Sequence, residues 1–144
     1  ILFYIGGTKV GAMFGEAVVF THGNMPKNFV TLVKQHGALL AKGWLLGVQF
    51  DTLFTDDLYC RIARHANDAA DRIREVLVER GYTLTFDAPT NQIFITLDNA
   101  TSERLQRNVR LGFMEKADDT HTVMRICTSW ATTDEQVEQL IALL

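Results

Sequence analysis

The chain has 144 residues, 47% hydrophobic and 22% charged, a composition typical of a folded globular protein. Its net charge of −3, without any run of basic residues, argues against a nucleic-acid-binding surface, which needs clustered Lys and Arg. No stretch is long and apolar enough to supply the ~20 residues that cross a membrane. Cys60 and Cys127 lack metal-site spacing, so we expect no metal and two packing thiols in a reducing compartment, by default the cytoplasm.

Two apolar runs near the start, residues 1–5 and 17–20, are predicted to be buried strands, because they are bounded by glycines and rich in aliphatic and aromatic side chains. Lys9 lies between them. A lysine between buried strands is poorly solvated as an ammonium ion, which makes its amine a usable nucleophile toward carbonyl compounds such as pyridoxal phosphate. The glycines around it would let a flat cofactor ring approach the backbone. The alternative is a glycine-rich hairpin whose lysine points to solvent.

Two helices are predicted next. Pro26 is suited to the first turn of a helix that reaches about Gly37. A second apolar segment covers residues 38–50 and carries almost no charge apart from Lys42. A helix that is apolar on most sides is buried inside a larger structure. This segment therefore predicts a subunit interface or a contact with a missing amino-terminal half.

The third predicted helix ends at Gly81 and has the clearest signals. Residues 55–57 (Thr-Asp-Asp) are expected to cap its amino end, and apolar residues recur along it at steps of three and four. We expect a domain boundary within this helix. Residues 1–60 would then end one domain, and residues 61–144 would form a small second domain.

The remaining residues read as short strands and helices. Residues 82–86 alternate like a half-buried strand, and residues 92–97 are predicted to pair with it across a turn. Further predicted elements are a helix at about 101–109 and strands near 112–115 and 122–127. The last helix opens with a capping box if Thr132 is its cap. Together these elements predict a small antiparallel sheet with helices on one face.

Arg125 lies in the predicted strand 123–127 among apolar neighbours. A buried charge needs an anionic or carbonyl partner, and the planar fork of arginine suits a carboxylate. Alternation places Met124 and Ile126 on one face of the strand and Arg125 on the other. The alternatives are an arginine that faces water on an edge strand, or one paired with an acid such as Asp98.

Three segments carry a resemblance to a known family. They are residues 4–20 (YIGGTKVGAMFGEAVVF), residues 37–47 (GALLAKGWLLG) and residues 124–133 (MRICTSWATT). In this order they resemble the cofactor-lysine segment, the following helix and the carboxylate-binding strand of the low-specificity threonine aldolases. These are fold-type-I enzymes of the pyridoxal-phosphate superfamily.

The resemblance implies an α/β fold, with the end of a fold-type-I large domain in residues 1–60 and a small α+β domain with an antiparallel sheet in residues 61–144. It implies that Lys9 binds pyridoxal 5′-phosphate covalently, that Thr8 also contacts the cofactor, and that Arg125 holds the α-carboxylate of an amino-acid substrate. The implied reaction is a carbon–carbon cleavage of L-threonine or related β-hydroxy amino acids to glycine and an aldehyde.

Enzymes of this family are more than twice as long, and their cofactor lysine lies past the middle of the chain. We therefore expect a carboxy-terminal piece that is inactive alone. The missing amino-terminal half of the protein would supply the catalytic base and the residues that bind the phosphate and the ring. Family members assemble as homodimers or homotetramers, and the same is expected here.

Two departures from the family pattern leave the reaction open. Val10 stands where asparagine is frequent, and Ser129-Trp130 replace a His-Leu pair after the arginine strand. The nearest alternative is a pyridoxal-phosphate-dependent β-eliminating lyase that acts on another amino acid. An alternative from another class is a non-catalytic α/β interaction module in which Lys9 has no special role.

Overall fold

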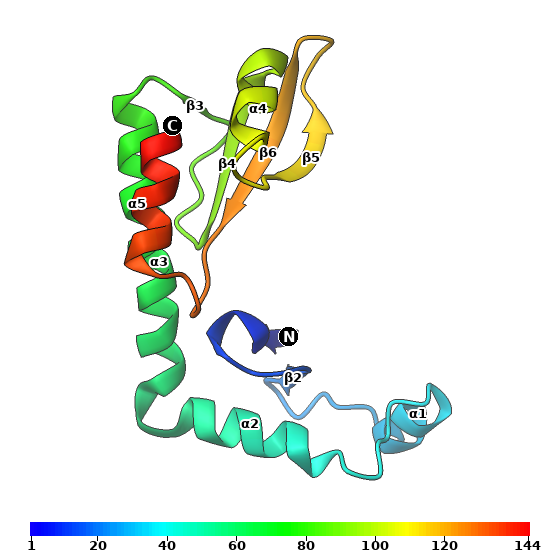
Figure 1. Cartoon of the computed structure of the whole chain (residues 1–144). Helices are drawn as coiled ribbons and strands as arrows, with labels where there is room; N and C mark the ends of the chain where they lie inside the picture. Colours follow the sequence, from blue (N-terminus) through cyan, green and yellow to red (C-terminus); the bar gives the residue numbers. More distant parts are fainter. The chain divides into compact units, whose positions relative to one another are not determined.

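In the computed structural model, which describes residues 1–144, the chain divides near the start of its longest helix, α3 (Leu58–Glu79). The two compact units are Ile1–Arg61 and Ile62–Leu144. Their assignment to two domains of a larger enzyme stays a prediction. None of the helices in Figure 1 has the length and hydropathy that a membrane span requires.

The first unit begins with an antiparallel pair of strands, β1 (Leu2–Gly6) and β2 (Glu16–Phe20). Both predicted strands are confirmed, but their predicted burial is wrong for this chain, since Tyr4 is 71% and Val18 54% exposed. The physical reason is that a two-stranded sheet has no second layer of its own to cover its apolar side chains.

Two helices follow, α1 (Phe29–Gln35) and α2 (Trp44–Phe54). The prediction that Pro26 lies in the first turn of the helix is wrong, because α1 begins at Phe29. The carbonyl of Pro26 accepts a hydrogen bond from the N–H of Phe29 (3.0 Å) in the turn before the helix. The apolar helix predicted in residues 38–50 is confirmed from Trp44 onward. It buries few of its side chains, and Trp44 is 63% exposed.

A short 3-10 turn, η2 (Thr55–Asp57), connects α2 to α3. Asp56 and Asp57 have φ values of 50° and 58°, in the left-handed region that costs L-residues energy. The prediction that residues 55–57 cap α3 is wrong, because Asp56 and Asp57 form a left-handed kink and Thr55 belongs to the end of α2. The hydroxyl of Thr55 donates backwards to the carbonyl of Asp51 (2.7 Å).

The second unit contains a four-stranded antiparallel sheet with the strand order β3-β4-β6-β5. Its strands are β3 (Thr83–Leu84), β4 (Gln92–Asp98), β5 (Gly112–Lys116) and β6 (His121–Cys127). Its further helices are α4 (Asn99–Gln106) and α5 (Asp134–Leu143). The small antiparallel sheet expected from the sequence is therefore confirmed.

One face of this sheet forms the core of the second unit. Ile93, Ile95 and Leu97 of β4 project to this face, beside Met124 and Ile126 of β6. The buried side chains of the three helices join them: Ala69, Ala70, Ile73 and Leu77 from α3, Leu105 from α4 and Val137 from α5. Figure 1 shows α5 alongside α3, and Arg72 of α3 forms ion pairs with Asp134 and Glu138 of α5.

A capping box starts α5. The hydroxyl of Thr133 accepts a hydrogen bond from the N–H of Gln136 (3.2 Å), and the side-chain oxygen of Gln136 accepts one from the N–H of Thr133 (3.0 Å). The prediction of Thr132 as the cap is wrong by one residue. The hydroxyl of Thr132 instead accepts from the N–H of Ser129 (2.9 Å), which stabilises the turn before the helix.

Replacing Thr133 with alanine is expected to lower the free energy of unfolding by about 1 kcal/mol, because it removes the acceptor for the Gln136 N–H. Urea denaturation of the chain measures the change. Thr133→Ser keeps the hydroxyl and is the matched control. Equal losses in the alanine and serine variants would contradict this role of the cap.

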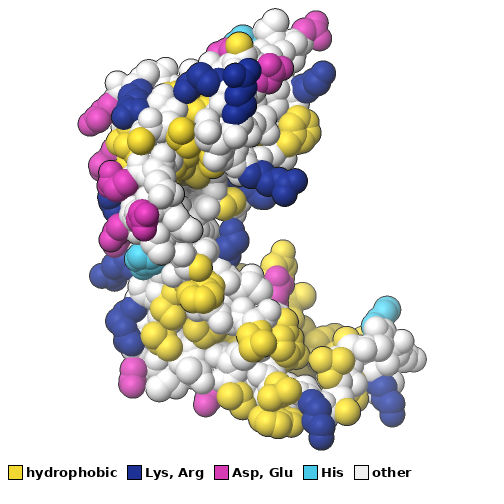
Figure 2. Space-filling view, viewed as in Figure 1, with side chains coloured by type: hydrophobic (Ala, Val, Ile, Leu, Met, Phe, Trp, Pro, Cys, Tyr) yellow, Lys and Arg dark blue, Asp and Glu magenta, His cyan; other side chains and the backbone are white.

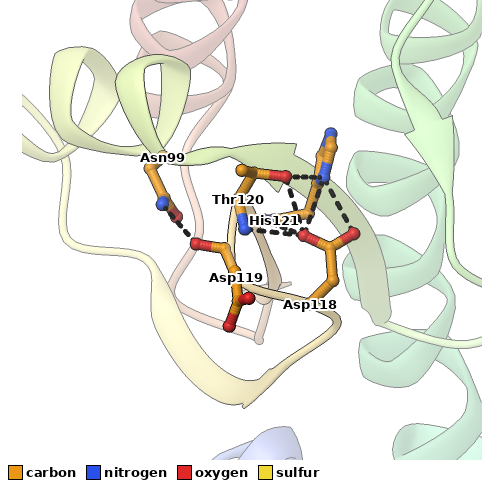
Figure 3. A network of polar contacts seen from close by, with 5 residues as sticks. All are labelled: Asn99, Asp118, Asp119, Thr120 and His121. Atoms are coloured by element: carbon orange, nitrogen blue, oxygen red, sulfur yellow. Dashed lines mark hydrogen bonds and ion pairs between the residues drawn. The ribbon is translucent and has the colours of Figure 1, made fainter.

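The turn between β5 and β6 is organised by Asp118, shown in Figure 3. Its carboxylate accepts hydrogen bonds from the N–H groups of Thr120 (2.7 Å) and His121 (2.8 Å) and from the Thr120 hydroxyl (2.8 Å). Nearby, the side chain of Asn99 donates to the carbonyl of Asp119 (3.2 Å). The hydrogen bonds from Thr120, first that of its backbone N–H, hold the pKa of Asp118 well below its usual range.

In the folded chain we expect the pKa of Asp118 to lie well below the ordinary aspartate value of about 3.9. Because the folded pKa is lowered, the ionised carboxylate stabilises the fold above the unfolded pKa, and this contribution is lost as the pH falls toward the folded pKa. NMR titration of the side-chain carboxyl carbon measures the pKa of Asp118. Thr120→Ala removes the hydroxyl donor and should raise the pKa. An Asp118 that titrates at the ordinary value in the wild type would show that the network does not form.

Candidate functional site

Lys9 lies on a 3-10 turn, η1 (Thr8–Val10), between β1 and β2. The turn begins with Gly7, whose carbonyl accepts hydrogen bonds from the N–H groups of Val10 (3.1 Å) and Ala12 (2.9 Å). It ends at Gly11, whose φ of 98° favours glycine. Val10 is buried and anchors the turn, whereas Lys9 is exposed. The expected enclosure of Lys9 between two buried strands is therefore wrong for this chain.

The glycines of this segment have different surroundings. A Cβ at Gly7 would lie 2.6 Å from the Cβ of Ala12 and 3.1 Å from the Cζ of Phe50, so Gly7 is needed for the close contact between the turn and α2. A Cβ at Gly6 would meet nothing within 4 Å. The space that a flat cofactor ring would need beside the backbone is therefore present at Gly6, whereas at Gly7 the side chains of Ala12 and Phe50 fill it.

The amine of Lys9 has no hydrogen bond and no ion pair in the structure. An exposed primary amine on a turn that is fixed by its neighbours can form a covalent bond with the carbonyl carbon of a ligand. Thr8 is exposed next to it and offers a hydroxyl as donor or acceptor. The turn therefore places both predicted cofactor contacts on one exposed segment.

Arg125 is half-buried on β6, opposite Phe94 of β4 and Gly112 of β5. It projects to the face away from Met124 and Ile126, as alternation predicts. Because β6 lies between β4 and β5, the alternative of an arginine on an edge strand is wrong.

The guanidinium of Arg125 is only partly satisfied by the protein. Its Nη1 donates to the side-chain oxygen of Gln92 (3.2 Å), and its Nε is buried without a hydrogen-bond partner. The proposed pairing with Asp98 does not occur. Asp98 accepts from the N–H of Thr101 (2.8 Å) at the start of α4, and this bond holds the pKa of Asp98 below its usual range. A half-buried cation that no acid neutralises is suited to bind an anionic ligand.

Two cavities lie in the second unit. A cavity of about 350 Å³ is lined by Arg125 together with Arg110, Gly112 and residues of α3 and α5. Another, of about 630 Å³, is bordered by charged groups that already serve the fold: Asp98 caps α4, Asp118 organises its turn, and Arg80 donates to the carbonyl of Ile141 (2.8 Å). Arg125 is among the residues that line the smaller cavity, whereas these charged groups of the larger cavity are already used by the fold.

The structure brings Thr8 and Lys9 together in the first unit and Gln92 and Arg125 together in the second. No group of three or more His, Cys, Asp or Glu side chains is arranged to hold a metal ion. The sequence analysis missed Gln92, because it lies 33 residues from Arg125. The register of β4 against β6 is the signal that could have found it, since a strand diagonal brings these long side chains within reach.

Comparison with known proteins gives a consistent result. No family model matches the chain. The chain is 30% identical over 136 residues to a low-specificity L-threonine aldolase of Pseudomonas aeruginosa, covering 94% of this chain and 38% of the relative. It is also similar to the solved structure of a threonine aldolase from Leishmania major, with 37% identity and a TM-score of 0.91 over 99% of this chain and 42% of that one.

A more distant neighbour supports the fold alone. Serine palmitoyltransferase from Sphingomonas wittichii matches 99% of this chain and 38% of its own, with 18% identity and a TM-score of 0.66. The mixed α/β fold of the chain is therefore that of the corresponding part of fold-type-I enzymes. The chain spans about two fifths of the length of the relatives it matches.

Proposed function

We propose that this chain, which is homologous to the low-specificity L-threonine aldolases, is part of a pyridoxal-phosphate-dependent lyase that cleaves L-threonine or related β-hydroxy amino acids to glycine and an aldehyde. The observation that carries the proposal is the free, exposed amine of Lys9, in a chain that matches a threonine aldolase structure over 99% of its length. The residues present fit the cofactor, because its aldehyde reacts with a nucleophilic primary amine and the amine of Lys9 has no other partner.

The residues of the chain would have separate roles. Lys9 would hold the cofactor covalently through its amine, and the neighbouring hydroxyl of Thr8 would bind it by a hydrogen bond. Arg125 would donate hydrogen bonds to the substrate α-carboxylate and so orient the Cα–Cβ bond that breaks. Pyridoxal phosphate supplies the sink for the electrons of that bond. We expect the group that removes the proton of the β-hydroxyl to come from the rest of a longer polypeptide.

The exposed apolar side chains of the first unit support a larger assembly. Figure 2 shows hydrophobic side chains gathered over α2 and its neighbourhood. Trp44, Leu45 and Val48 of α2 are 63%, 42% and 52% exposed, and neighbouring exposed apolar side chains of this kind are typical of a surface that another part of a protein covers. We propose that the remainder of a longer polypeptide covers this helix and that the protein assembles as a homodimer or homotetramer. The cytoplasmic location expected from the sequence stays a prediction.

Product analysis tests the proposed reaction. The full-length protein, supplied with pyridoxal phosphate and L-threonine, is expected to release glycine and acetaldehyde in equal amounts. A β-eliminating lyase would instead release ammonia and a keto acid, and this outcome would replace the aldolase proposal. A protein that neither binds the cofactor nor changes the amino acid would favour a non-catalytic module.

A further inference from the structure

We infer that Gln92 is a positioning residue for Arg125: it holds Nη1 of the guanidinium and thereby leaves the edge formed by Nε and Nη2 to bind the substrate carboxylate. This inference rests on the proposed function and concerns the same site. It assigns a role to a side chain on a neighbouring strand, and it specifies which two donors of the arginine contact the substrate.

The first argument is the contact itself. The side-chain oxygen of Gln92 accepts a hydrogen bond from Nη1 of Arg125 at 3.2 Å, and the backbone of Gln92 is fixed by the pairing of β4 with β6. Gln92 is half-buried, and so is Arg125. A long side chain on a central strand that is bonded at one end keeps a narrower range of orientations than a free one. Gln92 therefore limits how the guanidinium can turn.

The second argument is the count of remaining donors. A guanidinium presents two edges that can bind a carboxylate with two parallel hydrogen bonds, Nη1 with Nη2 and Nε with Nη2. Gln92 occupies Nη1, whereas Nε is buried and has no partner. A buried donor without a partner is costly, and an acceptor that arrives with a ligand would satisfy it. A carboxylate on the Nε edge is such an acceptor.

The third argument is the glycine opposite Arg125. A Cβ at Gly112 would lie 3.5 Å from Nε and 3.6 Å from the Cβ of Arg125. These are ordinary van der Waals separations, so an alanine would fit the fold there. Its methyl group would nevertheless place an apolar atom beside Nε, where a carboxylate oxygen would otherwise lie. Gly112 thus keeps this edge free of a side chain.

The test compares variants of the full-length protein with bound cofactor. Gln92→Glu places a carboxylate against Nη1, where it competes for the charge of Arg125. Gln92→Met keeps the length of the side chain and removes the acceptor. Both are expected to raise KM for L-threonine, Gln92→Glu by about tenfold, with little change in kcat. Gly112→Ala is expected to raise KM as well. Thr96→Val is the control and should leave both constants unchanged, because Thr96 lies on the same face of β4 and its hydroxyl bonds only to that of Thr85.

A binding measurement separates positioning from general damage. Titration of the cofactor absorbance with glycine and with methylamine compares two amines of which only glycine has a carboxylate. Gln92→Glu should weaken the binding of glycine about tenfold and leave that of methylamine unchanged, because only a carboxylate contacts Arg125. Equal weakening of both ligands, or a wild-type KM in all three site variants, would overturn the role of Gln92 and leave the aldolase proposal in place. A wild type without cofactor or cleavage activity would overturn both.

Discussion

Replacing Lys9 with arginine in the full-length protein is expected to lower kcat by about 10³-fold or more. Arginine keeps the positive charge on the turn, but its guanidinium stays protonated and does not act as a nucleophile. The loss therefore reports the amine and not the charge. The substitution should leave the fold intact, since the side chain of Lys9 is exposed and makes no contact that holds the turn in place.

Borohydride reduction provides the second readout for this variant. In the wild type, reduction followed by mass mapping is expected to find a pyridoxyl group on the peptide that carries Lys9, and in Lys9→Arg the group should be absent. Lys34→Arg, on the exposed side of α1, is the matched control and should retain both the adduct and the activity. An adduct on another lysine of the wild type would contradict the role given to Lys9.

Periodicity predicted most of the secondary structure, because alternation and three-to-four spacing follow directly from the geometry of strands and helices. The long helix α3 and the strands β4, β5 and β6 lie where these patterns place them, whereas the strand predicted at residues 82–86 is reduced to the two residues of β3. Burial at the start of the chain was predicted less well. An apolar run such as residues 1–5 indicates that a strand needs cover, but it does not say which part of the protein supplies the cover.

Local composition was also a poor guide to the backbone at the start of α3. Thr-Asp-Asp is typical of a helix cap, yet Asp56 and Asp57 adopt left-handed conformations. Aspartate tolerates both states, so the sequence alone does not separate them. The pairing of Gln92 with Arg125 was beyond prediction for a different reason, since it depends on the register between two strands that are distant in the chain. The resemblance pointed to Lys9 and Arg125, whereas the structure adds the neighbours that bear on what these residues do.

Replacing Arg125 with lysine is the second change with a large expected effect. Lysine keeps the charge but offers a point donor in place of two parallel N–H groups, so it can no longer hold both oxygens of a carboxylate in the plane of a guanidinium. We expect kcat/KM for L-threonine to fall about 10²-fold, mainly through KM, because the carboxylate contact exists before as well as during the reaction. Steady-state kinetics of the full-length protein measures both constants.

The substrate can be varied together with the residue, and this comparison identifies the contact. The wild type should prefer L-threonine strongly over L-threoninamide, which lacks the carboxylate, and Arg125→Lys should lose most of that preference because the amide never made the bidentate contact. Arg107→Lys, an exposed arginine at the end of α4, is the matched control and should keep the wild-type preference. If Arg125→Lys weakened the activity on both substrates equally, Arg125 would act by holding β6 in place and not by binding the carboxylate. The unpaired Nε of Arg125 favours a loss of the preference for L-threonine. A purely structural arginine would be expected to have its buried donors satisfied within the fold.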